Sequence, residues 1–183
     1  FGEALDSNPN AQTLIMRSNA LWKSDQRSEA IGELYDWLES SPDNTEVIQH
    51  LANLHLLADQ NQEAIALLRK LDTLRPSNPA VLNNLAWASR DSDPEASLRW
   101  AEEAKDLAPK NPGILDTYAM ALLSNNRSDE ALEINEGLIQ SAPDNRVFVT
   151  HRALIFAESG REEEAKQLLR SLIARDDEAV EAK

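Results

Sequence analysis

The side chains that most often carry out chemistry in proteins are sparse in this sequence and do not gather into a familiar site. There are three histidines, His50, His55 and His151, and no cysteine. His50 and His55 are five residues apart, a spacing that does not place two imidazoles on one helical face to bind one metal ion. We therefore interpret the three histidines as exposed or edge residues.

The acidic residues are numerous, but they form no pair suited to acid–base catalysis. The run Glu162, Glu163 and Glu164 is typical of the first turn of a helix, where the helix dipole favours negative charge. The sequence contains no glycine-rich phosphate loop, no nucleophile elbow and no zinc-binding helix motif. The lack of cysteine excludes disulfides and thiolate chemistry. We expect a protein that is not an enzyme and that needs no cofactor or metal.

The net charge of −14 limits the classes of partner. A surface with 32 acidic and 18 basic residues repels phosphate backbones and gives no basic anchor for an anionic membrane. No apolar run approaches the length of a membrane-spanning helix. The sequence therefore predicts a protein or peptide ligand, no nucleic acid and no direct membrane insertion in this segment.

Prolines punctuate the chain at a nearly constant interval. Pro9, Pro42, Pro76, Pro109 and Pro143 are separated by 33, 34, 33 and 34 residues, and an asparagine follows each within two residues. A fixed period of this size is typical of a helical repeat array. The proline ends one helix because it cannot donate a backbone hydrogen bond, and the polar residues after it can cap the next helix.

Each repeat contains two amphipathic stretches whose small and large apolar residues recur in register. We number positions so that the closing proline is position thirty-two. Positions four, eight and eleven of the first helix hold Leu14, Ser18 and Leu21; Ile48, Ala52 and His55; Leu82, Ala86 and Ser89; Leu115, Ala119 and Leu122; and Val149, Ala153 and Phe156. In the second helix, position twenty holds Ala30, Ala64, Ser97, Ala131 and Ala165. Small residues at positions eight and twenty predict that the two helices cross closely there.

The period and this residue pattern resemble the tetratricopeptide repeat (TPR) family. The resemblance implies an all-α fold, a right-handed α-solenoid of about five helix-turn-helix units. We expect helix pairs at 11–24 with 27–40, 45–58 with 61–74, 79–90 with 94–107, 112–125 with 128–141, and 146–159 with 162–175. Arg17 and Arg152 replace the usual leucine at position seven, and Asn135 replaces the usual aromatic residue at position twenty-four. These departures put the local packing in doubt.

We expect one array over residues 1–183, with repeats at 11–44, 45–78, 79–111, 112–145 and 146–177 and a tail at 178–183. Residues 1–10 match the end of a preceding repeat, so we expect further repeats upstream, in a longer protein; a capping turn is the alternative. Asp177 stands where a proline is expected, which indicates the end of the array.

In TPR proteins, positions two, five, nine and twelve of the first helices line a concave groove, and the resemblance implies a peptide-binding groove here. Asparagine can donate to and accept from a peptide backbone, and tryptophan is typical of binding hot spots. We expect Trp37 in the core, whereas Trp22 and Trp87 fit either the groove or the core. The candidate groove residues are Asn19, Trp22, Gln49, Asn53, Leu56, Asn83, Trp87, Arg90, Asp116, Met120 and Leu123.

Two narrower comparisons concern the ligand and its setting. The family's clamp for chaperone C-termini uses a lysine at position five, where this chain has Ile15, Gln49, Asn83, Asp116 and Thr150. A chaperone tail is therefore not the expected ligand. The run from Leu82 to Thr117 is similar to the C-terminal repeats of bacterial TPR lipoproteins that accompany exosortase (PEP-CTERM) and exopolysaccharide-export systems. That resemblance implies a periplasmic or outer-membrane-associated setting; the cytoplasm is the alternative.

The sequence therefore favours a non-enzymatic scaffold that binds a protein or peptide in its groove, in a bacterial envelope assembly for protein sorting or exopolysaccharide export. The alternative is a module for self-association, giving a homo-oligomer, or for joining domains of a larger and enzymatic protein.

Overall fold

The structure, a computed structural model, describes residues 10–181, with side chains through Ala174. This part of the chain is built from helices and contains no strand. The helices are α2 (Ala11–Lys23), α3 (Arg27–Ser40), α4 (Thr45–Leu57), α5 (Asn61–Leu74), α6 (Pro79–Ser89), α7 (Pro94–Leu107), α8 (Pro112–Ser124), α9 (Ser128–Ser141), α10 (Arg146–Glu158) and α11 (Glu162–Glu181). The all-α fold and the five expected helix pairs are confirmed. The match of residues 1–9 to a preceding repeat lies outside the described residues.

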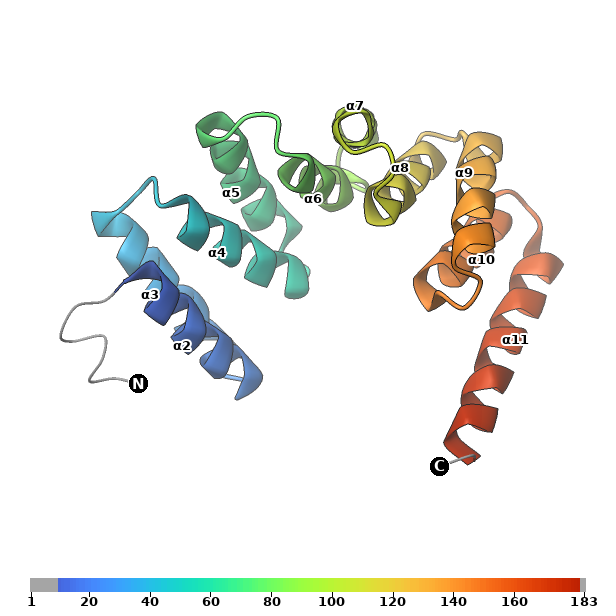
Figure 1. Ribbon diagram of the computed structural model, residues 1–183, viewed down its shortest axis with the longest axis horizontal. Coiled ribbons are helices and arrows are strands. Elements are labelled where there is room, and N and C mark those ends of the chain that lie inside the picture. The colour runs from blue at the N-terminus through green and yellow to red at the C-terminus, as the bar shows by residue number, and fades with distance from the viewer. Residues whose placement is uncertain (1–9, 182–183) are drawn as a thin grey trace. The chain divides into compact units, whose positions relative to one another are not determined.

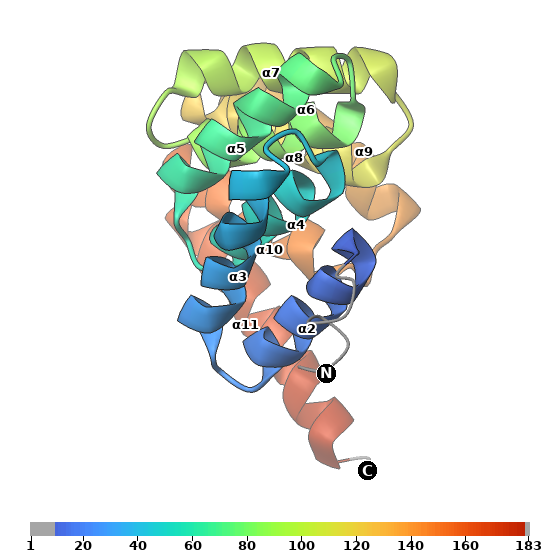
Figure 2. The ribbon, with the colours of Figure 1, turned by 90° about the vertical axis from the view of Figure 1, so that its left-hand side faces the viewer.

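The chain divides into two compact units, Phe1–Val81 and Leu82–Lys183, which we call unit 1 and unit 2. Unit 1 contains α2 to α5 and the first residues of α6. Unit 2 contains the rest of α6 and α7 to α11. Within each unit, consecutive helices lie side by side as hairpins, which can be followed in Figure 1 and, turned by 90°, in Figure 2.

The asparagine after each proline caps the first helix of the next repeat. The side-chain oxygen of Asn10 accepts a hydrogen bond from the Thr13 N–H at 2.8 Å, and that of Asn44 accepts one from the Val47 N–H at 3.1 Å. Asn78, Asn111 and Asn145 cap α6, α8 and α10 in the same way. Such a cap satisfies one of the free amides of the first turn and stabilises a helix by about 1 kcal/mol.

The turn inside a repeat has a left-handed residue at position fifteen in four of the five pairs. Asp25, Asp59, Asn126 and Gly160 have φ of 63°, 56°, 60° and 76°. In each case the next N–H bonds a carbonyl five residues back, as Gln26 does to Leu21 at 2.9 Å. Aspartate and asparagine tolerate this conformation better than other non-glycine residues. The shorter third turn instead closes through the Asp93 N–H to the Ser89 carbonyl at 2.7 Å.

The two helices of each pair approach most closely at positions eight and twenty. The Ser18 hydroxyl at position eight donates to the Ala30 carbonyl at position twenty, 3.3 Å away. In the third repeat the direction reverses, and the Ser97 hydroxyl donates to the Ala86 carbonyl at 2.7 Å. A side chain as short as serine reaches the opposite backbone, so the expected close crossing is confirmed.

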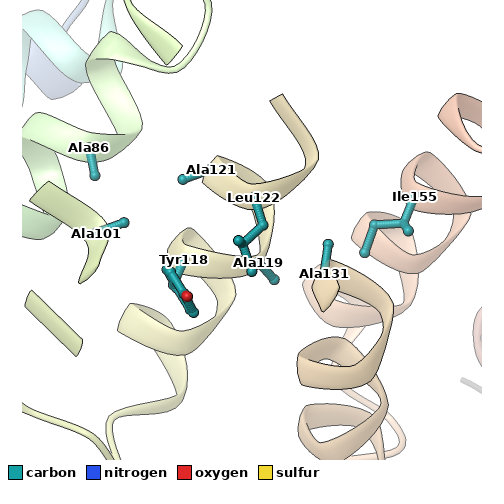
Figure 3. Close-up of a cluster of buried hydrophobic side chains, with 8 residues drawn as sticks. All are labelled: Ala86, Ala101, Tyr118, Ala119, Ala121, Leu122, Ala131 and Ile155. Atoms are coloured by element: carbon teal, nitrogen blue, oxygen red, sulfur yellow. The ribbon is translucent and has the colours of Figure 1, made fainter. Parts of the chain in front are cut away.

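The packing stripes form the cores of both units. In unit 1, Leu14, Leu34 and Leu51 are buried, and Trp22 and Trp37 pack against them from the edge. In unit 2, Figure 3 shows a cluster drawn from α6 to α10, with Ile155 directed toward the face that carries Ala131. The members of this cluster are Ala86, Ala101, Tyr118, Ala119, Ala121, Leu122, Ala131 and Ile155.

The three departures from the repeat pattern are accommodated by polar contacts. Asn135 is fully buried; its amide donates to the Phe148 carbonyl at 2.9 Å and its oxygen accepts from Arg152 Nε at 3.1 Å. Two unusual residues therefore satisfy each other between α9 and α10. Arg17 pairs with Glu33 on the facing helix α3. The packing is altered locally, and the helix pairs keep their register.

The last helix differs from the sequence expectation. Helix α11 continues to Glu181, beyond the expected end at residue 175, because Asp177 provides no proline stop. None of the described helices combines the length and apolar character needed to cross a membrane.

Replacing Ala131 with leucine should destabilise unit 2. The site is fully buried at the close crossing of α8 and α9, so extra methyl groups must displace packed neighbours, at a cost of about 1–3 kcal/mol. Chemical denaturation measures this. Ala66→Leu, at an exposed position of α5, is the matched control and should leave the free energy of unfolding nearly unchanged. Equal stability of both variants would contradict the assigned crossing.

The stability of the protein should fall in mild acid partly through His50. Burial lowers the pKa of His50 below its usual 6.5 in the folded state. Between the lowered pKa and 6.5 the unfolded chain binds more protons, so the stabilisation is complete above pH 6.5 and is lost as the pH falls. His50→Gln should lose less unfolding free energy between pH 7.5 and 5.5 than the parent. The interval from pH 7.5 to 8.5 serves as control, and an identical acid loss in both proteins would refute the role of His50.

Candidate protein-binding groove

The first helices of unit 2 carry a second row of side chains beside the packing stripe. Positions nine and twelve fall on this row in α6, α8 and α10, because residues three and four apart share a helical face. Position nine holds Trp87, Met120 and Leu154, and position twelve holds Arg90, Leu123 and Ala157. The row is apolar at its centre in all three helices.

Trp87 is the most prominent residue of this row. It is 38% exposed, which is unusual for so large an aromatic side chain. The guanidinium of Arg90 lies over its ring, 4.5 Å from the centroid. The imidazole of His151, from α10, lies 5.8 Å from the same ring with an interplanar angle of 33°. Trp87 is therefore held from two sides while part of its surface stays accessible.

His151 connects α10 to α8 through a short polar contact. Its Nδ1 lies 2.9 Å from both carboxylate oxygens of Asp116. The side chains of His151 and Asp116 are 15% and 9% exposed, so this contact is largely shielded from water. Trp87, His151 and Asp116 together link the first helices of three consecutive repeats.

An open groove runs beside this cluster, with a volume of about 480 Å³. Met120 forms its floor and is 1% exposed, whereas Leu154 on the α10 side is 40% exposed. Arg90 pairs with Asp91 at 3.1 Å on the opposite rim. Its volume falls in the range of ligand-binding clefts, although its lining mixes apolar and polar side chains. The lining residues are Arg90, Asp91, Pro94, Met120, Leu123, Ser124, Leu154 and Glu158.

The candidate residues of unit 1 are placed less favourably for an apolar ligand. Gln49 donates to the side-chain oxygen of Asn53 at 3.1 Å, and Leu56 is half-buried. Trp22 packs against the unit 1 core, with the Arg27 guanidinium 5.2 Å from its ring centroid. Asn19 is exposed on α2. This face of unit 1 is polar, and its tryptophan is part of the core edge.

Several candidate residues have roles that the sequence did not reveal. Asp116 is 6% exposed and contacts His151, so it joins α8 to α10 and is not among the groove-lining residues. The side-chain oxygen of Asn83 is buried and has no hydrogen-bond partner within the described part of the chain. Trp37, which we expected in the core, is partly buried and packs against the core from its edge. Its indole Nε1 is buried and has no hydrogen-bond partner among the described residues. Trp100 packs against the unit 2 core.

The expectation of exposed or edge histidines is wrong for His55. This residue is 4% exposed, with its Nε2 2.9 Å from the Tyr35 hydroxyl and its Nδ1 2.8 Å from Gln60 Oε1. His50 is also half-buried, and its Nε2 has no partner among the described residues. His55 fills a packing position, and the repeat alignment indicates this because His55 stands at position eleven.

Sequence reasoning missed the rim residues Asp91, Pro94, Ser124 and Glu158. Ser124 and Glu158 follow position twelve directly, and Asp91 and Pro94 belong to the shortened third turn. The available signal was the length of the third repeat, which has 33 residues at 79–111 against 34 at 45–78. The start of α7 lies beside the end of α8 there. The Asn125 amide confirms this approach by donating to the Pro94 carbonyl at 2.8 Å.

The described residues contain no group of three or more His, Cys, Asp or Glu side chains placed to hold a metal ion.

Comparisons with known proteins agree on the architecture. A tetratricopeptide repeat protein from Parabacteroides merdae superposes with a TM-score of 0.82 at 15% identity, covering 94% of this chain and 68% of that chain. MamA from Desulfovibrio magneticus gives 0.73 at 13% identity, covering 92% and 96%. YrrB, described as a TPR protein with an unusual peptide-binding site, gives 0.67 at 18% identity, covering 94% and 90%. The chain is thus an all-α helical repeat solenoid.

Sequence comparison finds the same repeat in part of the chain. Residues 21–88 match the family model described as tetratricopeptide repeat. The human mitochondrial import receptor subunit TOM70 is 24% identical over 153 residues, 79% of this chain, and the chain spans 25% of its length. Over residues 21–88 the chain is therefore similar to the tetratricopeptide repeat family, in agreement with the repeat found along the chain.

His151→Ala should destabilise unit 2 more than Asp116→Ala does. The first variant leaves the largely shielded Asp116 carboxylate without its hydrogen-bond partner, which costs about 1–3 kcal/mol, whereas the second leaves one imidazole nitrogen without a partner. Urea denaturation at pH 7.5 measures both. The double variant should regain stability relative to His151→Ala alone, because it removes the unpaired charge. Additive losses in the double variant would show that the two residues act independently.

Proposed function

We propose that this chain is a scaffold that holds a segment of a partner protein in the groove of unit 2. The observation that carries the proposal is the exposed Trp87, fixed by Arg90 and His151 at the edge of a groove with a Met120 floor. A large aromatic side chain that is rigid before binding loses little conformational entropy on binding, which is the usual character of a hot spot.

The wider comparisons are consistent with this role. The peptide-binding site named for YrrB belongs to that protein, and TOM70 is named as an import receptor subunit. The first description names a peptide-binding site, and the second names a receptor. The proposed ligand of the present chain is likewise a polypeptide, and catalysis is no part of the proposed role.

The proposed setting is a bacterial envelope assembly for protein sorting or exopolysaccharide export, in the periplasm or at the outer membrane. It rests on the resemblance of Leu82 to Thr117 to repeats of bacterial TPR lipoproteins. That segment contains Arg90, Asp91 and Pro94, which line one side of the groove.

Self-association is the alternative function, and a specific observation favours it. Leu169 and Ile173 on α11 are 40% and 61% exposed, an apolar surface that a second copy or a neighbouring domain could cover. Light scattering separates the two functions, because the scaffold function needs no concentration-dependent increase in mass.

A peptide bound by the protein should protect the unit 2 groove. Peptides selected from a random 12-residue phage-display library provide the probe, and hydrogen exchange with and without the best synthetic peptide should show slower exchange in α6, α8 and α10. Trp87→Ala should weaken that peptide at least tenfold, about 1.4 kcal/mol, without lowering the melting temperature appreciably.

The matched control is Leu107→Ala, which removes a similarly exposed apolar side chain from α7 outside the groove and should leave the affinity unchanged. Asn53→Ala tests whether the polar face of unit 1 also contacts the peptide. Protection confined to helices other than α6, α8 and α10, or wild-type affinity in the Trp87 variant, would refute the proposed groove.

A further inference from the structure

The charges around the unit 2 groove are unequal, and this imbalance bears on the chemistry of its ligand. Arg90 is the cation of the lining, and it is already paired with Asp91 at 3.1 Å. Glu158, on the α10 rim, is exposed and makes no ion pair with any described residue. The groove therefore presents an uncompensated carboxylate beside an apolar floor.

Leu154 and Glu158 are placed to act together. They are four residues apart on α10, so their side chains are neighbours on one face, about 5–6 Å apart at Cβ. Leu154 is 40% exposed and offers an apolar contact. A ligand side chain that covers Leu154 therefore lies within reach of the Glu158 carboxylate.

The Trp87 ring is a poor site for a cation of the ligand. Arg90 already lies over it at 4.5 Å, and the His151 ring lies 5.8 Å away. A further cation there would meet the positive guanidinium. Glu158 is therefore the residue that would bind a cationic side chain of the ligand. Trp87 would contact an apolar side chain of the ligand.

On these grounds, and resting on the proposed function, we infer that the groove selects a basic amphipathic segment of a partner protein. That segment carries a bulky aliphatic or aromatic residue three or four positions from a lysine or arginine. The long stem of lysine or arginine can lie along Leu154 while its charge reaches Glu158. The net charge of −14 adds a long-range attraction for such a segment and disfavours acidic ones.

The test compares peptide selection by the parent, Glu158→Lys and Glu158→Gln. The parent should enrich 12-residue peptides with an apolar residue three or four positions from Lys or Arg. Glu158→Lys should shift the selected peptides toward Asp or Glu and weaken the best parental peptide at least tenfold, with a smaller loss for Glu158→Gln. The parental affinity should also fall between 50 and 300 mM salt, about the range in which screening shortens from roughly 14 to 6 Å.

Glu136→Lys is the matched control, because Glu136 is an exposed carboxylate on α9 outside the groove. It carries the same change in net charge and should alter the affinity by less than twofold. Leu154→Ser should weaken binding, whereas Leu107→Ser, at another exposed leucine, should not.

The outcomes separate this inference from the function on which it rests. Peptides that protect α6, α8 and α10 but show no basic preference, or equal effects of Glu158→Lys and Glu136→Lys, would overturn the inference and leave the peptide-binding groove intact. If no selected peptide protects these helices, both fail.

Discussion

The close approach of two helices at positions eight and twenty is the contact on which the rest of this structure depends. All ten residues at these positions are alanine or serine, and all are buried. The two serine hydroxyls bond the facing backbone, which shows that the helices have no room for larger side chains. Because the crossing fixes how each first helix is rotated, it also fixes which residues remain on the opposite row, at positions nine and twelve.

Capping and turn residues determine where each helix starts, and for this reason the helix boundaries can be predicted from the sequence. The asparagine caps and the left-handed residues at position fifteen are local signals, satisfied by atoms a few residues away. Local signals and a repeated period could be predicted from the sequence, and helix ends agree with the expected ones within one or two residues up to Arg161. The error at α11 has the same origin, since Asp177 gives no stop signal.

The contacts that join neighbouring repeats in unit 2 could not be predicted, because they join residues that are distant in sequence and occur once. His151 and Asp116 are 35 residues apart, and Arg152 and Asn135 are 17 apart. Each pair joins different repeat positions in two neighbouring repeats, so the repeat pattern does not predict the contact. In the same way, position nine predicted that Met120 lies on the groove row, but its burial as the floor depends on the walls supplied by α6 and α10.

The distinction between repeated and unique residues explains why the groove in unit 2 has an apolar floor. Position nine holds Asn19 and Asn53 in unit 1 but Trp87, Met120 and Leu154 in unit 2, although the backbone that presents them is the same. The deletion in the third turn then adds Asp91 and Pro94 to the rim. The repeat therefore supplies a rigid surface, and a few non-repeated side chains on it determine what the surface can bind. Their chemistry is apolar with an unpaired carboxylate at Glu158, so charge as well as shape limits the partner.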